Sequence, residues 1–167
     1  MSDTTDTVAR DTTQDNPGVI APPPLIYFGG LVIGLFLHAR FPLRLFPRMA
    51  NGARVPFGGA LLALGITLAL SGFQTMRRAG TNVNPTQPTT TIVVEGPYRL
   101  TRNPLYLSLT LCYAGIATLI NTFWAMLLLP LVLLLINRGV IDREEQYLER
   151  KFGRLYLNYK ERVGRWL

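Results

Sequence analysis

Long uncharged runs alternate with short charged segments along the chain. Residues 19–39, 55–76 and 103–137 contain no Asp, Glu, Lys or Arg. A helix of about 20 apolar residues crosses the hydrocarbon core of a bilayer. The first two runs therefore predict one membrane-spanning helix each, at roughly Leu25–Ala39 and Phe57–Met76. We expect an all-α, polytopic integral membrane protein.

The third run is too long for one span and long enough for two short ones. Its internal polar pair, Asn121-Thr122, predicts a tight hairpin. The helix before the hairpin should cover about Pro104–Ile120, because proline is favoured at the first helical position. The next helix should begin near Phe123, kink at Pro130 and continue past Arg138 into water. We thus expect about four transmembrane helices.

Polar segments flank and separate these spans. Residues 1–21 are rich in Thr and Asp and predict a disordered tail, which leaves residues 22–167 as a single membrane domain. Pro56 predicts that the loop after the first helix extends to this residue. The amphipathic segment Val140–Val163 predicts a cytoplasmic helical region, in which Gly153 divides two helices.

The charge distribution predicts the orientation. The net charge is +7. With four spans, thirteen of the seventeen Lys and Arg residues fall on the side of the two termini and the second loop. Basic residues mark the cytoplasmic side, so we expect both termini there, and we expect these residues to meet lipid phosphates rather than nucleic acid. One cysteine, Cys112, and one histidine, His38, indicate neither a disulfide framework nor a metal site.

A helical hairpin brings its two ends together, so Arg102 and Asn103 should lie near residues 138–145. Glu144 falls on the apolar face of that helix, where a buried carboxylate needs a partner. The partner is either an arginine, Arg99 or Arg102, in a structural ion pair, or a polar ligand. Glu145 is expected on the opposite, solvated face, where its removal should matter less.

The stretch GPYRLTRNPLY (residues 96–106) concentrates hydrogen-bonding groups where the third span enters the membrane. Asn103 and Pro104 fit a helix start, with asparagine as the N-cap and proline at the first position. Singly, the arginines and tyrosines of the stretch fit lipid-phosphate anchors and interfacial residues. These separate roles do not explain why so many polar side chains occur together, so the stretch is a candidate ligand site.

This stretch, the hydrophobic hairpin and the later sequence EEQYLERKFGRLYLNYKERV together resemble the isoprenylcysteine carboxyl methyltransferase and phospholipid methyltransferase superfamily, as a short member of bacterial type. The first piece corresponds to the family's G-x-Y-x-x-x-R-H-P-x-Y pattern. The second corresponds to its E-E-x-x-L-x-x-x-F-G-x-x-Y-x-x-Y pattern. The resemblance covers roughly residues 81–163, and the N-terminal half matches only in being hydrophobic.

The resemblance implies a methyltransferase of the bacterial inner membrane that uses S-adenosylmethionine and takes a lipophilic acceptor from the bilayer. Arginine suits the cofactor carboxylate, a glutamate suits its ribose hydroxyls, and tyrosine faces suit its sulfonium and adenine. The implied cofactor-binding residues are Glu95, Gly96, Tyr98, Arg102, Asn103, Pro104, Tyr106 and Glu144. Three of them, Arg102, Asn103 and Glu144, are the implied catalytic residues.

Two positions depart from the family's patterns. Asn103 stands where the family has histidine, and asparagine cannot titrate, which argues against a histidine base. Val140 stands where the prenylcysteine enzymes place an arginine that holds the acceptor carboxylate, and Arg138 and Arg143 are out of register with it. Prenylcysteine is therefore not the expected acceptor.

Two other classes of protein stay open. Sterol reductases, which use NADPH, share a related C-terminal architecture but are much larger. A non-catalytic membrane scaffold is the other alternative, although it would not need Glu144 on an apolar face. Binding of S-adenosylmethionine, of NADPH or of neither separates the three classes.

Overall fold

The computed structural model describes residues 17–47, 51–82 and 88–167. These residues form helices and no strand, which confirms the all-α prediction, and the predicted tail lies outside them up to residue 16. The elements are α1 (Pro23–Arg40), α2 (Asn51–Arg78), the 3₁₀ turn η1 (Gly96–Arg99), α3 (Pro104–Ile120), α4 (Phe123–Ile136), the π-helical turn η2 (Asn137–Ile141), α5 (Asp142–Phe152) and α6 (Arg154–Arg162).

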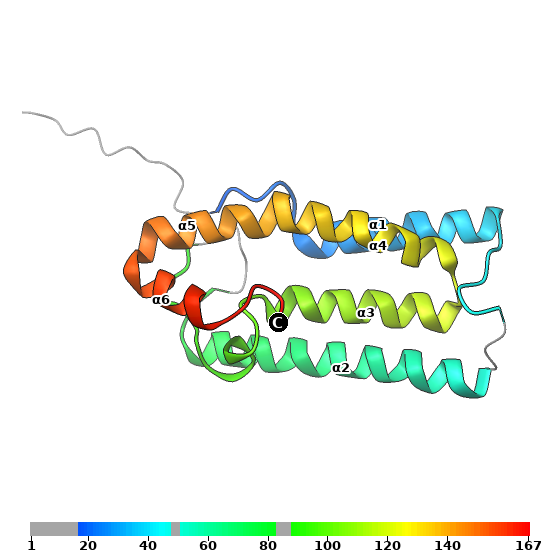
Figure 1. The fold of residues 1–167 in the computed structure, drawn as a ribbon, viewed down its shortest axis with the longest axis horizontal. Helices are drawn as coiled ribbons and strands as arrows, with labels where there is room; N and C mark the ends of the chain where they lie inside the picture. The colour runs from blue at the N-terminus through cyan, green and yellow to red at the C-terminus, as the bar shows by residue number, and fades with distance from the viewer. Residues whose placement is uncertain (1–16, 48–50, 83–87) are drawn as a thin grey trace, which may run out of the picture.

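Four long helices lie side by side in two pairs, α1 with α4 and α2 with α3 (Figure 1). Glycines allow each pair to pack closely. On α2, Gly58, Gly65 and Gly72 recur at every seventh residue and face α3, where a Cβ atom on Gly65 would lie 2.8 Å from a backbone oxygen. On α1, a Cβ atom on Gly34 would lie 2.5 Å from the Cα of Ala125. The helix backbones of each pair are therefore in direct contact.

Three helical segments are long and apolar enough to cross a membrane: α1, α2, and the continuous segment Phe123–Phe152 formed by α4, η2 and α5. The apolar helix α3 is shorter, at 17 residues. Large apolar side chains on α1 and α2 are exposed, as a lipid-facing surface requires; they include Leu25, Phe28, Ile33, Phe36, Leu64 and Leu70. The polytopic membrane fold is confirmed, with three to four spans.

Two predicted helix boundaries are confirmed. The hairpin between α3 and α4 lies at Asn121-Thr122, where Asn121 adopts a left-handed backbone (φ +62°) that asparagine tolerates. The hydroxyl of Thr122 accepts a hydrogen bond from Ala125 N in the first turn of α4. Gly153 separates α5 from α6 with φ +54°, a conformation that favours glycine.

The predicted loop up to Pro56 is wrong, because α2 begins at Asn51 and contains Pro56 in its second turn. Arg54 donates through Nη1 to the carbonyl oxygens of Thr118 and Leu119, and through Nη2 to Asn51 Oδ1. These bonds fix the start of α2 against the end of α3, whose last carbonyls lack helical partners. The tertiary contact outweighs the backbone hydrogen bond that proline cannot make.

One end of the bundle gathers segments that are far apart in the sequence (Figure 1). The loop before η1 meets α5, where Thr89 N donates to Tyr147 Oη at 3.2 Å. The start of α3 meets the segment after α6, where Arg102 N donates to Gly164 O at 3.0 Å. Arg102 Nη1 also lies 3.0 Å from Glu145 Oε1, so the predicted meeting of Arg102 with residues 138–145 is confirmed.

Candidate active site

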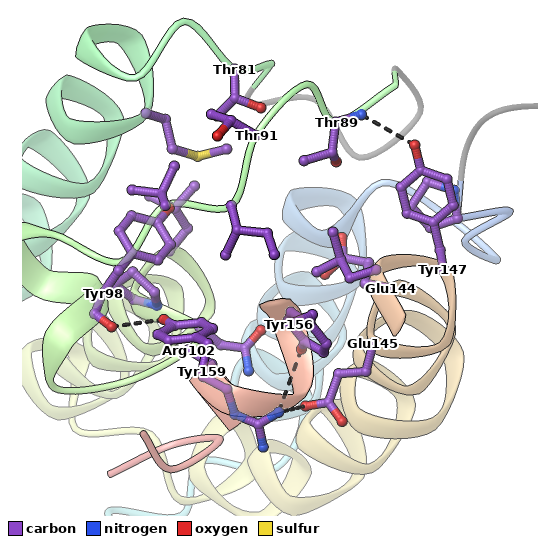
Figure 2. A pocket seen from close by; sticks show the side chains of 18 of the residues that line it. Thr81, Thr89, Thr91, Tyr98, Arg102, Glu144, Glu145, Tyr147, Tyr156 and Tyr159 are labelled. Atoms are coloured by element: carbon purple, nitrogen blue, oxygen red, sulfur yellow. Dashed lines mark hydrogen bonds and ion pairs between the residues drawn. The ribbon is translucent and has the colours of Figure 1, made fainter. Parts of the chain in front are cut away.

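A cavity opens at this end, between α5, α6, the loop before η1 and the start of α3 (Figure 2). The space inside it that a water-sized molecule can occupy is about 140 Å³. Its polar lining residues are Thr81, Asn82, Thr89, Thr91, Tyr98, Arg102, Asn103, Tyr106, Glu144, Glu145, Tyr147, Tyr156 and Tyr159.

Glu144 is the carboxylate that α5 presents to the start of α3. Its Oε1 accepts a hydrogen bond from Tyr106 Oη at 2.6 Å. Tyr106 is fixed in turn, because its carbonyl oxygen accepts hydrogen bonds from Tyr27 Oη at 3.2 Å and from Thr110 Oγ1 at 2.9 Å. A carboxylate offers about four lone-pair directions and one phenol occupies one of them. The others leave Glu144 able to accept hydrogen bonds from a ligand.

Arg102 forms an ion pair with Glu145, which is only 5% exposed. Glu145 Oε1 lies 3.0 Å from Arg102 Nη1, and its Oε2 lies 2.7 Å from Arg165 Nη2. The prediction that Glu145 faces water is therefore wrong. The alternative of an ion pair between Glu144 and Arg99 or Arg102 is also wrong, since the described residues form neither pair.

The error has a physical reason: the helical face of Glu145 is covered by later residues. Asp142 and Glu149 share that face, as the helical count predicted. However, α6 and the segment after it fold back over α5. Arg165 Nη1 lies 2.9 Å from Asp142 Oδ1, and Lys160 Nζ lies 2.6 Å from Glu149 Oε1. The face of α5 that carries Asp142, Glu145 and Glu149 is thus an interface between α5 and the end of the chain.

Arg102 lies between α5 and α6 with a side chain only 9% exposed. The Nη1 atom that meets Glu145 also donates to Tyr156 Oη at 3.4 Å. Burial, with the nearby Glu145 carboxylate as the next cause, raises the pKa of Tyr156 to about 12, so its phenol stays neutral. Arg102 Nε is buried without a hydrogen-bond partner in the described part of the chain. An unpaired buried donor costs free energy, so a ligand oxygen at this N–H would be stabilising.

Tyr98 and Tyr159 form the wall beside Arg102 (Figure 2). Tyr159 Oη donates to Tyr98 O at 2.7 Å, and the rings of Tyr156 and Tyr159 meet edge to face with centroids 6.2 Å apart. Burial raises the pKa of Tyr98 and of Tyr159, so both phenols are neutral. Such aromatic faces attract cations and stack on planar rings.

The segment after α6 holds the start of α3 in place. Arg165 O accepts hydrogen bonds from Thr101 Oγ1 and from Asn103 Nδ2, both at 3.0 Å, and Gly164 O accepts one from Arg102 N. Asn103 occupies the N-cap position of α3, but its side chain makes no capping hydrogen bond. The predicted capping role of that side chain is wrong; the side chain instead donates through Nδ2 to the Arg165 carbonyl.

The cavity brings together six of the eight predicted cofactor-binding residues: Tyr98, Arg102, Asn103, Pro104, Tyr106 and Glu144. Glu95 and Gly96 are exposed and do not belong to its lining. Gly96 has φ +56°, and a Cβ atom there would lie 2.8 Å from Thr75 Oγ1. Glycine at this position therefore allows the chain to turn into η1 while its backbone lies close to α2.

Among the lining residues that sequence reasoning missed are four polar ones on α5 and α6: Glu145, Tyr147, Tyr156 and Tyr159. Two of them carried a signal, because Tyr156 and Tyr159 are the tyrosines of the F-G-x-x-Y-x-x-Y pattern. Residues three apart on a helix share a face, so the pattern itself places both rings on one side of α6. Tyr147 had no such signal, since its partner Thr89 lies in a loop without helical period.

Most of the residues that form this site lie in a part of the chain that matches a known protein family. The phospholipid methyltransferase family profile matches residues 53–155, more than half of the chain, from the start of α2 to the start of α6. An uncharacterized protein of Haemophilus influenzae is 43% identical over 63 residues, which are 38% of this chain and the whole of that protein. No solved structure matches the chain. By the extent of the profile match, the chain belongs to the phospholipid methyltransferase family.

Proposed function

We propose that this protein is an S-adenosylmethionine-dependent methyltransferase that modifies a lipophilic acceptor at the membrane surface. One observation carries the proposal: residues from both sequence patterns, 38 positions apart at Tyr106 and Glu144, share one cavity and a 2.6 Å hydrogen bond. Membership of a methyltransferase family supports the reaction type.

The chemistry of the lining fits the groups of this cofactor. The unpaired Nε of Arg102 suits a carboxylate, for which arginine is a strong partner. The Glu144 carboxylate, held by Tyr106, suits the two ribose hydroxyls. The faces of Tyr98 and Tyr159 suit a sulfonium and an adenine ring.

When bound, the cofactor supplies a methyl group on a positively charged sulfur. The residues of the chain then contribute by positioning, because aligning two reactants in one site removes much of the barrier to a direct displacement. Asn103 cannot accept a proton at neutral pH, and its amide is bonded to Arg165 O. We therefore assign Asn103 to fixing the start of α3 rather than to base catalysis.

The acceptor is proposed to arrive sideways from the bilayer. The cavity lies at the N-terminal end of the apolar helix α3, where the chain passes from membrane to water, and its lining includes Met76, Leu105 and Leu148. A lipid anchored by its own tail presents its polar end at this depth.

The acceptor proposal predicts which molecules receive the methyl group. Incubation with methyl-labelled S-adenosylmethionine and a membrane lipid extract should label a lipid, detected by mass spectrometry. A long-chain version of that lipid should be turned over faster than a water-soluble short-chain version at equal bulk concentration, because its tail concentrates it in the membrane.

Equal turnover of the two versions would show that the acceptor comes from water. Binding of NADPH without methyl transfer would favour the reductase class. A chain that binds neither cofactor in purified form would favour the scaffold.

The proposed orientation predicts which positions react from outside the cell. In a Cys112→Ala background, a cysteine at Asn51, at the far end of α2, should be labelled by an impermeant maleimide on intact cells. Cysteines at Thr90 and Asn158 should be labelled only after lysis, because thirteen of seventeen basic residues fall on their side. All three positions are exposed. Labelling of Thr90 from outside would invert the orientation.

A further inference from the structure

A second hollow lies on α5, and Glu144 and Glu145 do not belong to its lining. Its helical wall carries three arginines and a glutamine, and the residues before α1 form the other wall. We call Arg138, Arg143 and Arg150 the arginine ridge.

The π-helical turn η2 aligns this ridge. Residues five apart in an α-helix point about 140° away from each other, which would separate Arg138 from Arg143. In η2, however, Asp142 N donates to Asn137 O, the i to i+5 bond of a π-turn. The wider turn brings Arg143 onto the same face as Arg138. Arg150 lies seven residues, or about two α-helical turns, after Arg143 and therefore shares that face.

The opposite wall of the hollow is fixed to this turn. Ile20 N donates to Gly139 O at 3.3 Å, and a Cβ atom on Gly139 would collide with the Ile20 side chain. Arg143 Nη1 donates to Gly18 O at 2.7 Å, which holds that guanidinium at the rim. The hollow is therefore built from the residues before α1 together with η2 and α5, rather than from one exposed helix face.

The arginine ridge carries uncompensated positive charge. All three arginines are exposed, and none forms an ion pair within the described residues. The carboxylate in the hollow, Asp142, is already paired with Arg165 at 2.9 Å. Arg138 comes two residues after Ile136, the end of the apolar helix α4. This places the charge where a membrane helix leaves the hydrocarbon and meets lipid headgroups.

We propose that the arginine ridge binds the phosphate of an anionic phospholipid. Guanidinium groups bind phosphate oxygens in a bidentate fashion, and Gln146 in the same wall adds a neutral donor. A lipid bound here would be distinct from the methyl acceptor, because the hollow and the candidate active site share no residue of α5, although Pro17 borders both. Its binding would hold α5, the helix that supplies Glu144 and Glu145 to the cavity.

The test measures lipid preference of the full chain in a neutral detergent by native mass spectrometry. Phosphatidylglycerol should bind at least fivefold more tightly than phosphatidylcholine with the same acyl chains. The triple variant Arg138→Gln, Arg143→Gln and Arg150→Gln should reduce this ratio to about one. The matched control is Arg77→Gln, Arg78→Gln and Arg99→Gln, three exposed arginines at the same end of the bundle, and it should keep the ratio.

The ratio should also survive in Glu144→Gln, because that residue lies in the other cavity. An unchanged ratio in the ridge variant would overturn the proposal. Equal losses in the ridge and control variants would overturn it too, since the preference would then reflect general basic charge. Inorganic phosphate that displaced phosphatidylglycerol with equal affinity would identify a free-phosphate site instead of a lipid site.

Discussion

Replacing Glu145 with alanine should lower the free energy of unfolding by about 3–5 kcal/mol, because it leaves a buried charge without its partner. Arg102, with a side chain 9% exposed, would lose the carboxylate that lies 3.0 Å from its Nη1. Arg165 would lose the hydrogen bonds that its Nε and Nη2 donate to the same group. Thermal unfolding in detergent, monitored by circular dichroism or by the loss of monodisperse protein, measures the effect.

The matched control for this variant is Glu149→Ala. Glu149 lies one turn further along the same face of α5, but its side chain is 33% exposed and its partner Lys160 is 38% exposed. Ion pairs that water reaches stabilise by at most about 1 kcal/mol. If the two alanine variants unfolded at the same temperature, the Arg102–Glu145 pair would not be a buried structural link.

The second large effect is expected on cofactor affinity. Glu144→Gln should weaken S-adenosylmethionine binding at least tenfold, a loss of about 1.4 kcal/mol. Glutamine keeps the size of the side chain but replaces one accepting oxygen by a donating amide, so it cannot serve two ribose hydroxyls as a carboxylate does. Isothermal titration calorimetry of the purified protein measures the dissociation constant, and an unaltered unfolding temperature would show that the variant is folded.

Two further variants sharpen the interpretation of this measurement. Glu161→Gln removes an exposed carboxylate of α6 and should leave affinity unchanged. Arg102→Ala should also weaken binding, but it breaks the pair with Glu145 as well, so its unfolding temperature should fall with its affinity. Wild-type affinity in Glu144→Gln would remove Glu144 from the cofactor site and leave it a partner of Tyr106 alone.

The apolar pattern predicted the helices well because membrane spans follow from local sequence. The Asn121-Thr122 hairpin and the start of α3 at Pro104 lie where polarity and proline placed them. The meeting of Arg102 with the tail followed from the hairpin alone, since two ends of a hairpin must be close.

The errors arose where a contact across the fold decides the local environment. Helical periodicity placed Glu145 with Asp142 and Glu149 correctly, but it could not reveal that Arg165 returns to cover them. Likewise, Pro56 lies in a helix because Arg54 is bonded to the end of α3. Side-chain contacts between residues 20 or more apart in the sequence leave no periodic signal, so the partner of each carboxylate required the structure.

The pairing of α1 with α4 has a consequence for how the chain is made. During synthesis, α2 and α3 follow each other, whereas α1 ends at Arg40 and its partner begins at Phe123. At about 5–20 residues per second, the ribosome needs on the order of 4–16 s to cover that interval. Gly30 and Gly34, where an added Cβ atom would meet Val132 and Ala125, lack these neighbours during this time. The nascent first helix must therefore persist in the membrane without α4, which its uncharged sequence allows, and the site can assemble only after the last span has emerged.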